Sequence, residues 1–524
     1  MKTFDNIIIG SGINGLVAAS VLAKKGRKVL LLERNEQIGG CIRSDEATEP
    51  GFVHDVMATT FVLFITSPAY AVLADDLHAR GLEFCQPEFP SGVLMDDGRS
   101  CVISMNADDN RARLNALSPG DGDRMRENVG EIGANAELIF ALLGSELWSL
   151  ATAKLLAKAA WKMGPHALTR FFGRGLDTAR RWLETEYKSE VSQALWAPWV
   201  LHTGLGPEST YSGQMGRVIA FALEAAGAPI VKGGAKNILT AFEKLITDFG
   251  GEIRTGADVE RIIVKNAKAI GVRLSDGEEI GVSRSVIASV APKALYQNLL
   301  AGSGIDSTVV EEAKSYRYGK GDMQIHYSLH GKPQWANEEL SKVALLHLSD
   351  GIDSVSKASN EAERGMIPEN PTVCVGQPTS FDPSRCPEGK SILWLQLPEV
   401  PRHVKGDAAG KINIPADGKW TSELKEAYAD RIEARLRKHI KNFDEIKGVR
   451  TSYSPGDLEA MNVNLVGGDP YGGYCGIDQF FVWRPLGSQK NHSTPIGNVF
   501  HIGASTHPGP GLGGGSGLLV SKKA

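Results

Sequence analysis

The chain has 524 residues, 42% of them hydrophobic, and its formal net charge is −4 at pH 7. A chain of this length exceeds a single hydrophobic core and predicts about two to four domains or lobes. The slightly acidic charge gives no basic field that would attract a polyanion, so nucleic acid is excluded as a partner.

A dinucleotide-binding turn opens the chain. Residues 5–9 predict a buried parallel strand, and the turn Gly10-Ser11-Gly12-Ile13-Asn14-Gly15 follows it. In such a turn the first glycine permits the tight bend, the second lets backbone N–H groups approach a pyrophosphate, and the third allows close helix packing. We therefore expect Gly10, Gly12, Asn14 and Gly15 to contact the cofactor. The phosphates would rest on the N-terminus of a helix over residues 16–25.

A second strand is predicted over residues 28–32, and Glu33 follows it. An acidic residue about twenty positions beyond the glycines can accept hydrogen bonds from ribose hydroxyl groups. The sequence therefore predicts a cofactor with a free ribose rather than a 2′-phosphate.

The next segment distinguishes flavin from nicotinamide. It reads Glu33-Arg34-Asn35-Glu36-Gln37-Ile38-Gly39-Gly40-Cys41-Ile42-Arg43-Ser44. It resembles the E-R-x-x-x-x-G-G-x-x-R-S/T extension of FAD oxidoreductases related to phytoene desaturases and amine oxidases. The resemblance implies that Gly39 and Gly40 lie against the FAD phosphates and that Arg34 and Arg43 help to hold the cofactor. Cys41 stands where that family often has Arg or Ala. The alternative is a Rossmann-like turn without FAD.

Residues 76–230 carry a helical lobe in this interpretation. Asp97-Gly98 predicts a hairpin turn, and helical patterns dominate from about residue 118 to 187. Five of the nine tryptophans fall in this region: Trp148, Trp161, Trp182, Trp196 and Trp199. They either line a pocket for an apolar substrate or pack between helices.

A lysine stripe marks one helix of that lobe. Lys154, Lys158 and Lys162 repeat every four residues beside aliphatic neighbours. Such a stripe is either the solvated side of an amphipathic helix or a face that lies on an anionic membrane surface.

Residues 231–300 resemble the family's second cofactor segment, with a glycine pair, a helix over 237–249 and strands at 252–255, 258–265 and 285–289. By that resemblance the backbone of Val259 contacts adenine. The alternative is an ordinary strand valine.

The third cofactor segment lies near the C-terminus and includes Gly503-Ala504-Ser505-Thr506-His507-Pro508-Gly509-Pro510-Gly511-Leu512. It resembles the G-A/S-x-T-H-P-G-x-G motif of the phytoene dehydrogenase-like family, which lies beside the isoalloxazine ring. Gly503, Gly511 and Leu512 are the contacts that this resemblance implies. No second complete fingerprint is present, so electrons are expected to leave to oxygen, a quinone or another diffusible acceptor.

Three residues are candidates for catalysis. His507 either transfers a proton near the flavin or shapes the glycine-rich turn. Trp483 and Arg484 are candidates to wall the pocket and to hold an anionic substrate end, with a structural arginine as the alternative.

The histidines show no metal-ligand spacing, and the six cysteines contain no C-x-x-C motif, so no metal site is predicted. We expect reduced thiols in a cytoplasmic protein, because no targeting segment or membrane span is evident, with peripheral membrane contact left open.

Together these patterns predict an α/β protein. A discontinuous Rossmann-type FAD-binding domain (1–75, 231–300 and 471–524) would alternate with a mixed sheet-and-helix substrate domain (76–230 and 301–470). The family resemblance implies FAD-dependent dehydrogenation or desaturation of a largely apolar small molecule. The alternatives are an amine or amino-acid oxidase of the same architecture and a flavin-binding interaction protein without turnover.

Overall fold

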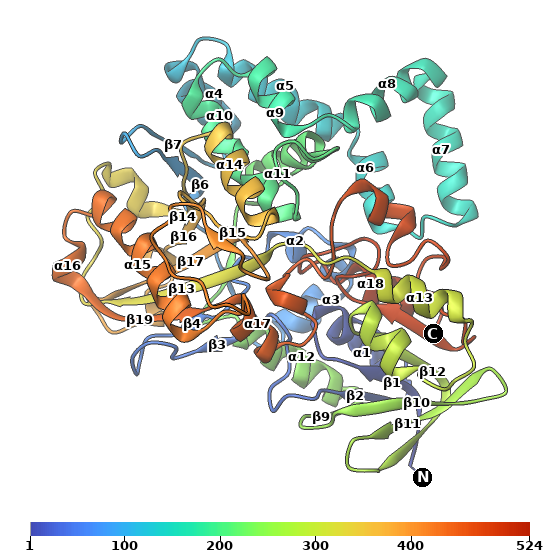
Figure 1. The fold of residues 1–524 in the computed structure, drawn as a ribbon. Coiled ribbons are helices and arrows are strands. Elements are labelled where there is room, and N and C mark those ends of the chain that lie inside the picture. Colours follow the sequence, from blue (N-terminus) through green and yellow to red (C-terminus); the bar gives the residue numbers. More distant parts are fainter. Residues whose placement is uncertain (1) are drawn as a thin grey trace.

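The computed structural model describes residues 2–524 and is a mixed α/β fold built on two large sheets (Figure 1). The first sheet has seven strands in the order β10-β11-β12-β1-β2-β9, with β20 paired to β12. Its strands are β1 (Thr3–Ile9), β2 (Val29–Leu32), β9 (Glu252–Arg254), β10 (Val259–Lys265), β11 (Lys268–Leu274), β12 (Glu279–Ser289) and β20 (Val499–Ile502).

The centre of the first sheet explains the apolar run at the N-terminus. β1 pairs in parallel with both β2 and β12. A parallel strand with helices on both faces must be apolar throughout, as Ile7, Ile8 and Ile9 are. The helix after the turn, α1 (Ile13–Lys24), is buried along nearly its whole length between the sheet, α12 (Lys236–Asp248) and α18 (Gly515–Ser521). It begins three residues earlier than the sequence predicts.

The second sheet also has seven strands, in the order β19-β13-β17-β16-β14-β6-β7. They are β6 (Phe89–Leu94), β7 (Ser100–Ile103), β13 (Gly321–Leu329), β14 (Val343–Leu348), β16 (Val373–Gly376), β17 (Ser391–Val400) and β19 (Lys447–Tyr453). One face of this sheet packs on α15 (Ser422–His439) through Leu424, Tyr428 and Leu436. The other face meets the helical lobe and the chain just beyond the flavin extension.

Helices fill the region between β7 and residue 226. They are α4 (Ala107–Leu117), α5 (Asp121–Ala134), α6 (Ala136–Gly144), α7 (Leu150–Met163), α8 (Pro165–Gly175), α9 (Ala179–Glu186), α10 (Glu190–Trp196), the 3₁₀ helix η1 (Ala197–Thr203) and α11 (Ser212–Ala226). The helical lobe therefore continues well beyond residue 187. The pair α7 and α8 projects from the rest of the molecule (Figure 1).

Shorter elements complete the chain. The helices are α2 (Val62–Ile65), α3 (Pro68–His78), α13 (Ser307–Ser315), α14 (Ile352–Glu363), α16 (Phe443–Ile446) and α17 (Pro455–Met461). The strands are β3 (Ser44–Asp45), β4 (His54–Asp55), β5 (Phe84–Cys85), β8 (Ile230–Val231), β15 (Met366–Ile367) and β18 (Gly406–Asp407). Across residues 2–524, no helix combines the length and apolarity that a membrane crossing requires.

The first sheet draws its strands from residues 3–32, 252–289 and 499–502, so segments far apart in sequence form one structural unit. The second sheet draws on residues 89–103 and 321–453. The exact boundaries between cofactor and substrate domains stay a prediction.

Candidate functional site

The three glycines of the first turn meet different surroundings. A Cβ atom on Gly10 would lie 2.7 Å from the carbonyl oxygen of Ser289, and one on Gly15 would lie 2.1 Å from the carbonyl oxygen of Gly10. A Cβ on Gly12 would meet no heavy atom within 4 Å. Gly10 and Gly15 are therefore fixed by packing within the protein, whereas Gly12 faces open space at the N-terminal end of α1. That open space is what an approaching pyrophosphate needs.

Glu33 lies directly beside this turn. Its carboxylate accepts hydrogen bonds from the backbone N–H and hydroxyl of Ser11 (3.0 and 2.6 Å) and from the backbone N–H of Asn35 (3.0 Å). Two oxygens offer about four acceptor positions, so capacity remains for a ribose hydroxyl. Glu33 also bonds through its backbone to Arg254 and Ala257, which brings the start of β10 and Val259 to the same edge.

The glycine pair of the extension folds back onto the turn. Gly39 forms a parallel bridge with Gly12, and its N–H donates to the Ser11 hydroxyl at 3.0 Å. A Cβ on Gly40 would lie 3.2 Å from the Cα of Gly12. Cys41, which comes next, accepts a hydrogen bond from the Asn462 side chain. The structure thus gathers the predicted phosphate-binding glycines at one place.

The two arginines of the extension lie at its edges. Arg34 is half-exposed near Asp258, with 4.0 Å between its Nε and a carboxylate oxygen. Arg43 pairs with Asp45 at the start of the short β3–β4 hairpin. Their roles toward FAD stay predictions.

A chain of hydrogen bonds connects the C-terminal segment to the first turn. The Gly503 N–H donates to the Ser516 hydroxyl at 3.0 Å, and that hydroxyl donates to the Asn14 side-chain oxygen at 2.8 Å. Asn14 therefore holds α18 against α1. Leu512 packs against the core of the first sheet, and a Cβ on Gly511 would reach within 2.5 Å of Leu63.

The candidate catalytic residues lie in different environments. His507 is 3% exposed, and its ring nitrogens lie near the carbonyls of Leu142 and Ser145 without meeting hydrogen-bond geometry. Burial lowers the pKa of His507 to about 4, so the ring is neutral at physiological pH. The ring therefore lies against the C-terminal end of α6, and a role for His507 toward flavin or substrate stays a prediction.

Trp483 and Arg484 are adjacent in sequence but differ in solvent exposure. Trp483 is 48% exposed, whereas Arg484 is buried. The Arg484 guanidinium donates to the backbone carbonyls of Tyr471 (2.6 Å), Tyr474 (3.4 Å) and Ala504 (2.8 Å). Arg484 thus holds the loop around Tyr471 against the C-terminal segment, which agrees with the structural alternative.

Sequence reasoning missed a buried polar row on β13. Asp322, Gln324 and His326 alternate with Met323, Ile325 and Tyr327, a pattern that suggests a solvent-facing side. All nine residues of β13 are nevertheless buried, because residues 49–57 and the helical lobe cover the polar face. The His326 ring nitrogen contacts the Val56 carbonyl at 3.3 Å, and the Trp394 indole donates to the Met57 carbonyl at 3.1 Å. The chain that follows the flavin extension therefore lies on this face.

Comparison with known proteins agrees with these features. Residues 8–77, which include the turn and the extension, match the NAD(P)-binding Rossmann-like domain family. A limonene dehydrogenase polypeptide of Castellaniella defragrans is 24% identical, with 100% of this chain and 94% of that protein covered. A zeta-carotene-forming phytoene desaturase of Myxococcus xanthus is 25% identical, with 97% and 90% covered.

The chain is an oxidoreductase that is similar to phytoene desaturases and to a limonene dehydrogenase over nearly its whole length. The open space at Gly12 and the stacked glycines fit FAD as the cofactor of this oxidoreductase. The fold is shared with putrescine oxidase, which superposes with a TM-score of 0.63 at 16% identity over 99% of this chain and 98% of that one.

Three potential metal ligands of the oxidoreductase lie together where the 3₁₀ helix η1 meets β14 and β16 of the second sheet, a grouping that sequence spacing did not predict. Atoms of His202, His347 and Cys374 lie within 4.8 Å of one another. The ring nitrogens of His202 and His347 are 2.9 Å apart and share a hydrogen bond, and Cys374 is paired with His347 across β14 and β16. The hydrogen bond joins the two imidazole rings directly.

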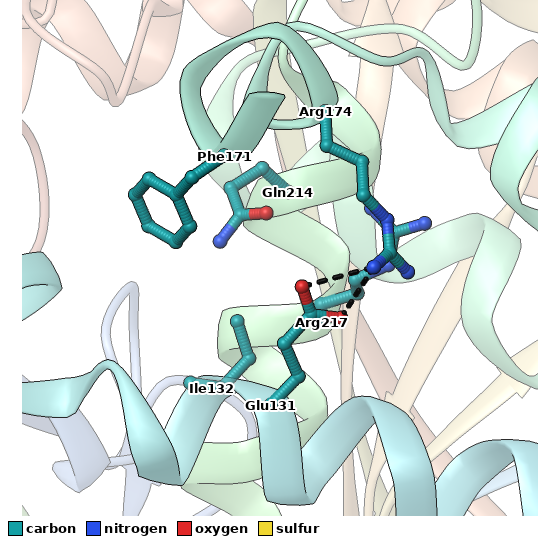
Figure 2. Close-up of a pocket in the computed structure, with 6 residues that line it drawn as sticks. All are labelled: Glu131, Ile132, Phe171, Arg174, Gln214 and Arg217. Atoms are coloured by element: carbon teal, nitrogen blue, oxygen red, sulfur yellow. Dashed lines mark hydrogen bonds and ion pairs between the residues drawn. The ribbon is translucent and has the colours of Figure 1, made fainter. Parts of the chain in front are cut away.

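A small pocket lies in the helical lobe of the oxidoreductase, between α5, α8 and α11 (Figure 2). Arg174 closes one side through an ion pair with Glu131 at 2.9 Å. Neither the flavin turn nor β13 contributes to this pocket, so we do not assign it to the substrate.

Replacing Glu33 with alanine is expected to weaken FAD binding by about 1.5–3 kcal/mol, the range for a hydrogen bond to a charged group. Isothermal titration of the apoprotein with FAD measures this loss. Glu36→Ala, which changes an exposed carboxylate three residues further along the chain, serves as the control. Unchanged FAD affinity in Glu33→Ala would remove Glu33 from the ribose site.

Proposed function

We propose that this oxidoreductase dehydrogenates a terpenoid-like hydrocarbon and forms a carbon–carbon double bond. Bound FAD would supply the two-electron oxidation by accepting a hydride from a substrate C–H bond. The protein's own contribution is to hold an apolar chain beside the flavin turn and to keep water away from it.

The observation that carries this proposal is the apolar character of the covered face of the second sheet. Trp199, Leu345, Ile352 and Trp394 belong to one buried cluster on this face. Aliphatic and aromatic walls bind a hydrocarbon through apolar area, at about 25 cal/mol per Å² of surface removed from water. The similarity to a limonene dehydrogenase and to phytoene desaturases, over nearly the full chain, supports the same substrate class.

The rival function is amine oxidation, because putrescine oxidase and cyclohexylamine oxidase share the fold. The two functions differ in the donor that reduces the flavin. The FAD-loaded protein should be mixed without oxygen with limonene, with phytoene in detergent micelles, with putrescine and with cyclohexylamine. Bleaching of the flavin band by a hydrocarbon and not by the amines is expected. Bleaching by an amine alone would overturn the proposal, and no bleaching by any donor would favour a binding protein without turnover.

We infer oxygen or a quinone as the electron acceptor, because the chain carries one complete dinucleotide turn. After reduction by the hydrocarbon, reoxidation is followed with dissolved oxygen and with a soluble ubiquinone analogue. Hydrogen peroxide release identifies oxygen as the acceptor, and quinol formation identifies the quinone.

We also propose that α7 and α8 rest on an anionic lipid surface. Trp161 is 92% exposed and Leu150 is 73% exposed, and the Lys154, Lys158 and Lys162 side chains lie on the same projecting helix. Exposed aromatic and aliphatic groups beside lysines are typical of helices that lie in a membrane interface. A hydrocarbon substrate would be met at such a surface.

Replacing the three lysines with glutamine is expected to weaken binding to phosphatidylglycerol vesicles by roughly 1 kcal/mol for each charge removed. Vesicle co-sedimentation measures the partition, with phosphatidylcholine vesicles as the neutral comparison. A matched control, Lys244→Gln on α12, should bind like the unmodified protein. Equal sedimentation of the triple variant and the unmodified protein would contradict the membrane contact.

A further inference from the structure

Dehydrogenation of a hydrocarbon needs more than a hydride acceptor. When two neighbouring carbons become doubly bonded, one C–H bond loses a hydride with its electron pair and the other loses a proton. The flavin of the proposed function takes the hydride, so the substrate is oxidised and the flavin is reduced. The proton requires a base, and neither His507 nor Arg484, two of the catalytic candidates predicted from sequence, suits the task. His507 faces the end of α6, and Arg484 is occupied by backbone carbonyls.

We propose that Asp322 is the catalytic base that receives this proton. The inference rests on the proposed function. Asp322 lies near one end of β13 and is buried at 3% exposure. One of its carboxylate oxygens accepts hydrogen bonds from the side-chain amides of Gln324 (2.9 Å) and Gln396 (3.0 Å). The other oxygen, Oδ1, has no partner among the described residues.

That free oxygen is the geometric basis of the proposal. Buried carboxyl oxygens are rarely left without a partner, and such an exception calls for an explanation. Two amide donors hold the carboxyl group in one orientation and leave Oδ1 as its reactive atom. A proton arriving at Oδ1 would also neutralise a charge that burial disfavours.

The surroundings of Asp322 connect it to the flavin turn and to the apolar face. Its charge adds to burial in raising the pKa of Cys41, which follows the glycine pair, of Cys374 on β16, and of Tyr471 in the loop held by Arg484. These three groups face Asp322 from the flavin extension, the second sheet and the C-terminal part of the chain, and His326 shares its face of β13. Asp322 thus lies where the cofactor-binding and substrate-binding parts meet.

Burial is the main reason that the pKa of Asp322 is raised to about 7, with the two amides opposing the shift. A base is most effective when its pKa lies near the working pH. A large fraction of the base is then ionised, and the base still has a high affinity for the proton. Deprotonation favours catalysis, so the rate of hydride removal should rise with pH through about 7.

Glu399 provides a matched comparison. It is a second fully buried carboxyl group, on β17, and burial raises its pKa to about 7 as well. It accepts a hydrogen bond from the Thr372 N–H, lies near Lys320 and Glu361, and stands at the same end of the β13–β17 pair as Asp322. Its charge, unlike that of Asp322, does not contribute to the raised pKa of Cys41 or of Cys374.

The test compares Asp322→Asn with Glu399→Gln in the FAD-loaded protein. Both variants should keep the flavin spectrum and be reduced normally by dithionite, which establishes that each folds and binds FAD. In Asp322→Asn, anaerobic bleaching by limonene or phytoene should slow by about 10²–10⁴-fold, the usual contribution of a general base, and lose its rise with pH. Glu399→Gln should keep both the rate and its pH dependence. An Asp322→Asn variant with an unmodified rate and pH profile would overturn the proposal.

A second measurement needs no substrate. In Glu399→Gln, the infrared carbonyl band of a protonated carboxyl group should disappear as the pH is raised through about 7, and Asp322→Asn in that background should lack the band. A carboxyl group already ionised at pH 5 would overturn the assignment. This titration does not depend on turnover. If the hydrocarbons fail to reduce the unmodified protein, that result counts against the proposed function. The infrared titration then still tests the assignment of Asp322.

Discussion

An apoprotein that folds normally but retains no FAD is the expected result of Gly12→Val. A Cβ atom added to Gly12 would have no protein atom within 4 Å, so the valine side chain fits within the protein itself. The same space is where backbone N–H groups must approach the pyrophosphate, and two methyl groups there would keep the phosphates away. Flavin absorbance of the purified protein and its circular dichroism measure the two parts of this prediction.

Substitutions at two other glycines serve as comparisons for Gly12→Val. Gly130→Val on α5 also places a side chain in open space, far from the turn, and should leave FAD content unchanged. Gly15→Ala should disturb folding, because its Cβ would lie 2.1 Å from the Gly10 carbonyl oxygen. Full FAD occupancy in Gly12→Val would refute the assignment of this turn to the pyrophosphate.

The second large effect is expected at Arg385. Its guanidinium is fully buried and pairs with Asp55 at 2.7 Å and Asp382 at 2.9 Å, while a third nitrogen donates to the Val231 carbonyl at 2.6 Å. Removing one partner of a buried charge network leaves the remaining charges uncompensated and costs about 3–5 kcal/mol. Arg385→Ala should lower the free energy of unfolding by that amount.

The same network joins the end of the flavin extension to the start of α12. Asp55 also accepts hydrogen bonds from the Ser44 hydroxyl and the Ala235 N–H, both at 2.7 Å. Arg385→Ala should therefore weaken FAD binding as well as stability. Urea denaturation followed by circular dichroism measures the loss in the free energy of unfolding. Arg124→Ala, which breaks an exposed pair with Glu127, is the control and should cost less than about 1 kcal/mol. A similar small loss in Arg385→Ala would contradict the role given to the network.

The first strand, turn and second strand could be predicted because their signals are local. An apolar run, a glycine turn and Glu33 stand within the first 33 residues, and the hydrogen bonds from Ser11 to Glu33 form inside this unit. The helical lobe was underestimated, because α10 and α11 lie beyond the region of strongest helical pattern.

The polar row of β13 could not be predicted for a physical reason. Alternation of polar and apolar residues indicates a half-exposed strand when nothing covers the polar side. Here residues 49–57 and the helical lobe cover it, and both are distant in sequence. The contact from Asn14 to Ser516 is similar, since it joins residues 502 positions apart. Only the tertiary structure brings such groups together.

The central claim is that the flavin lies between the first turn and β13. A crystal structure of the protein loaded with FAD tests this most directly. We expect the pyrophosphate at Gly12 and the N-terminus of α1, with the isoalloxazine ring between the Gly511–Leu512 segment and the side of β13 that carries Asp322. A pyrophosphate bound elsewhere, or a ring pointing away from β13, would contradict it.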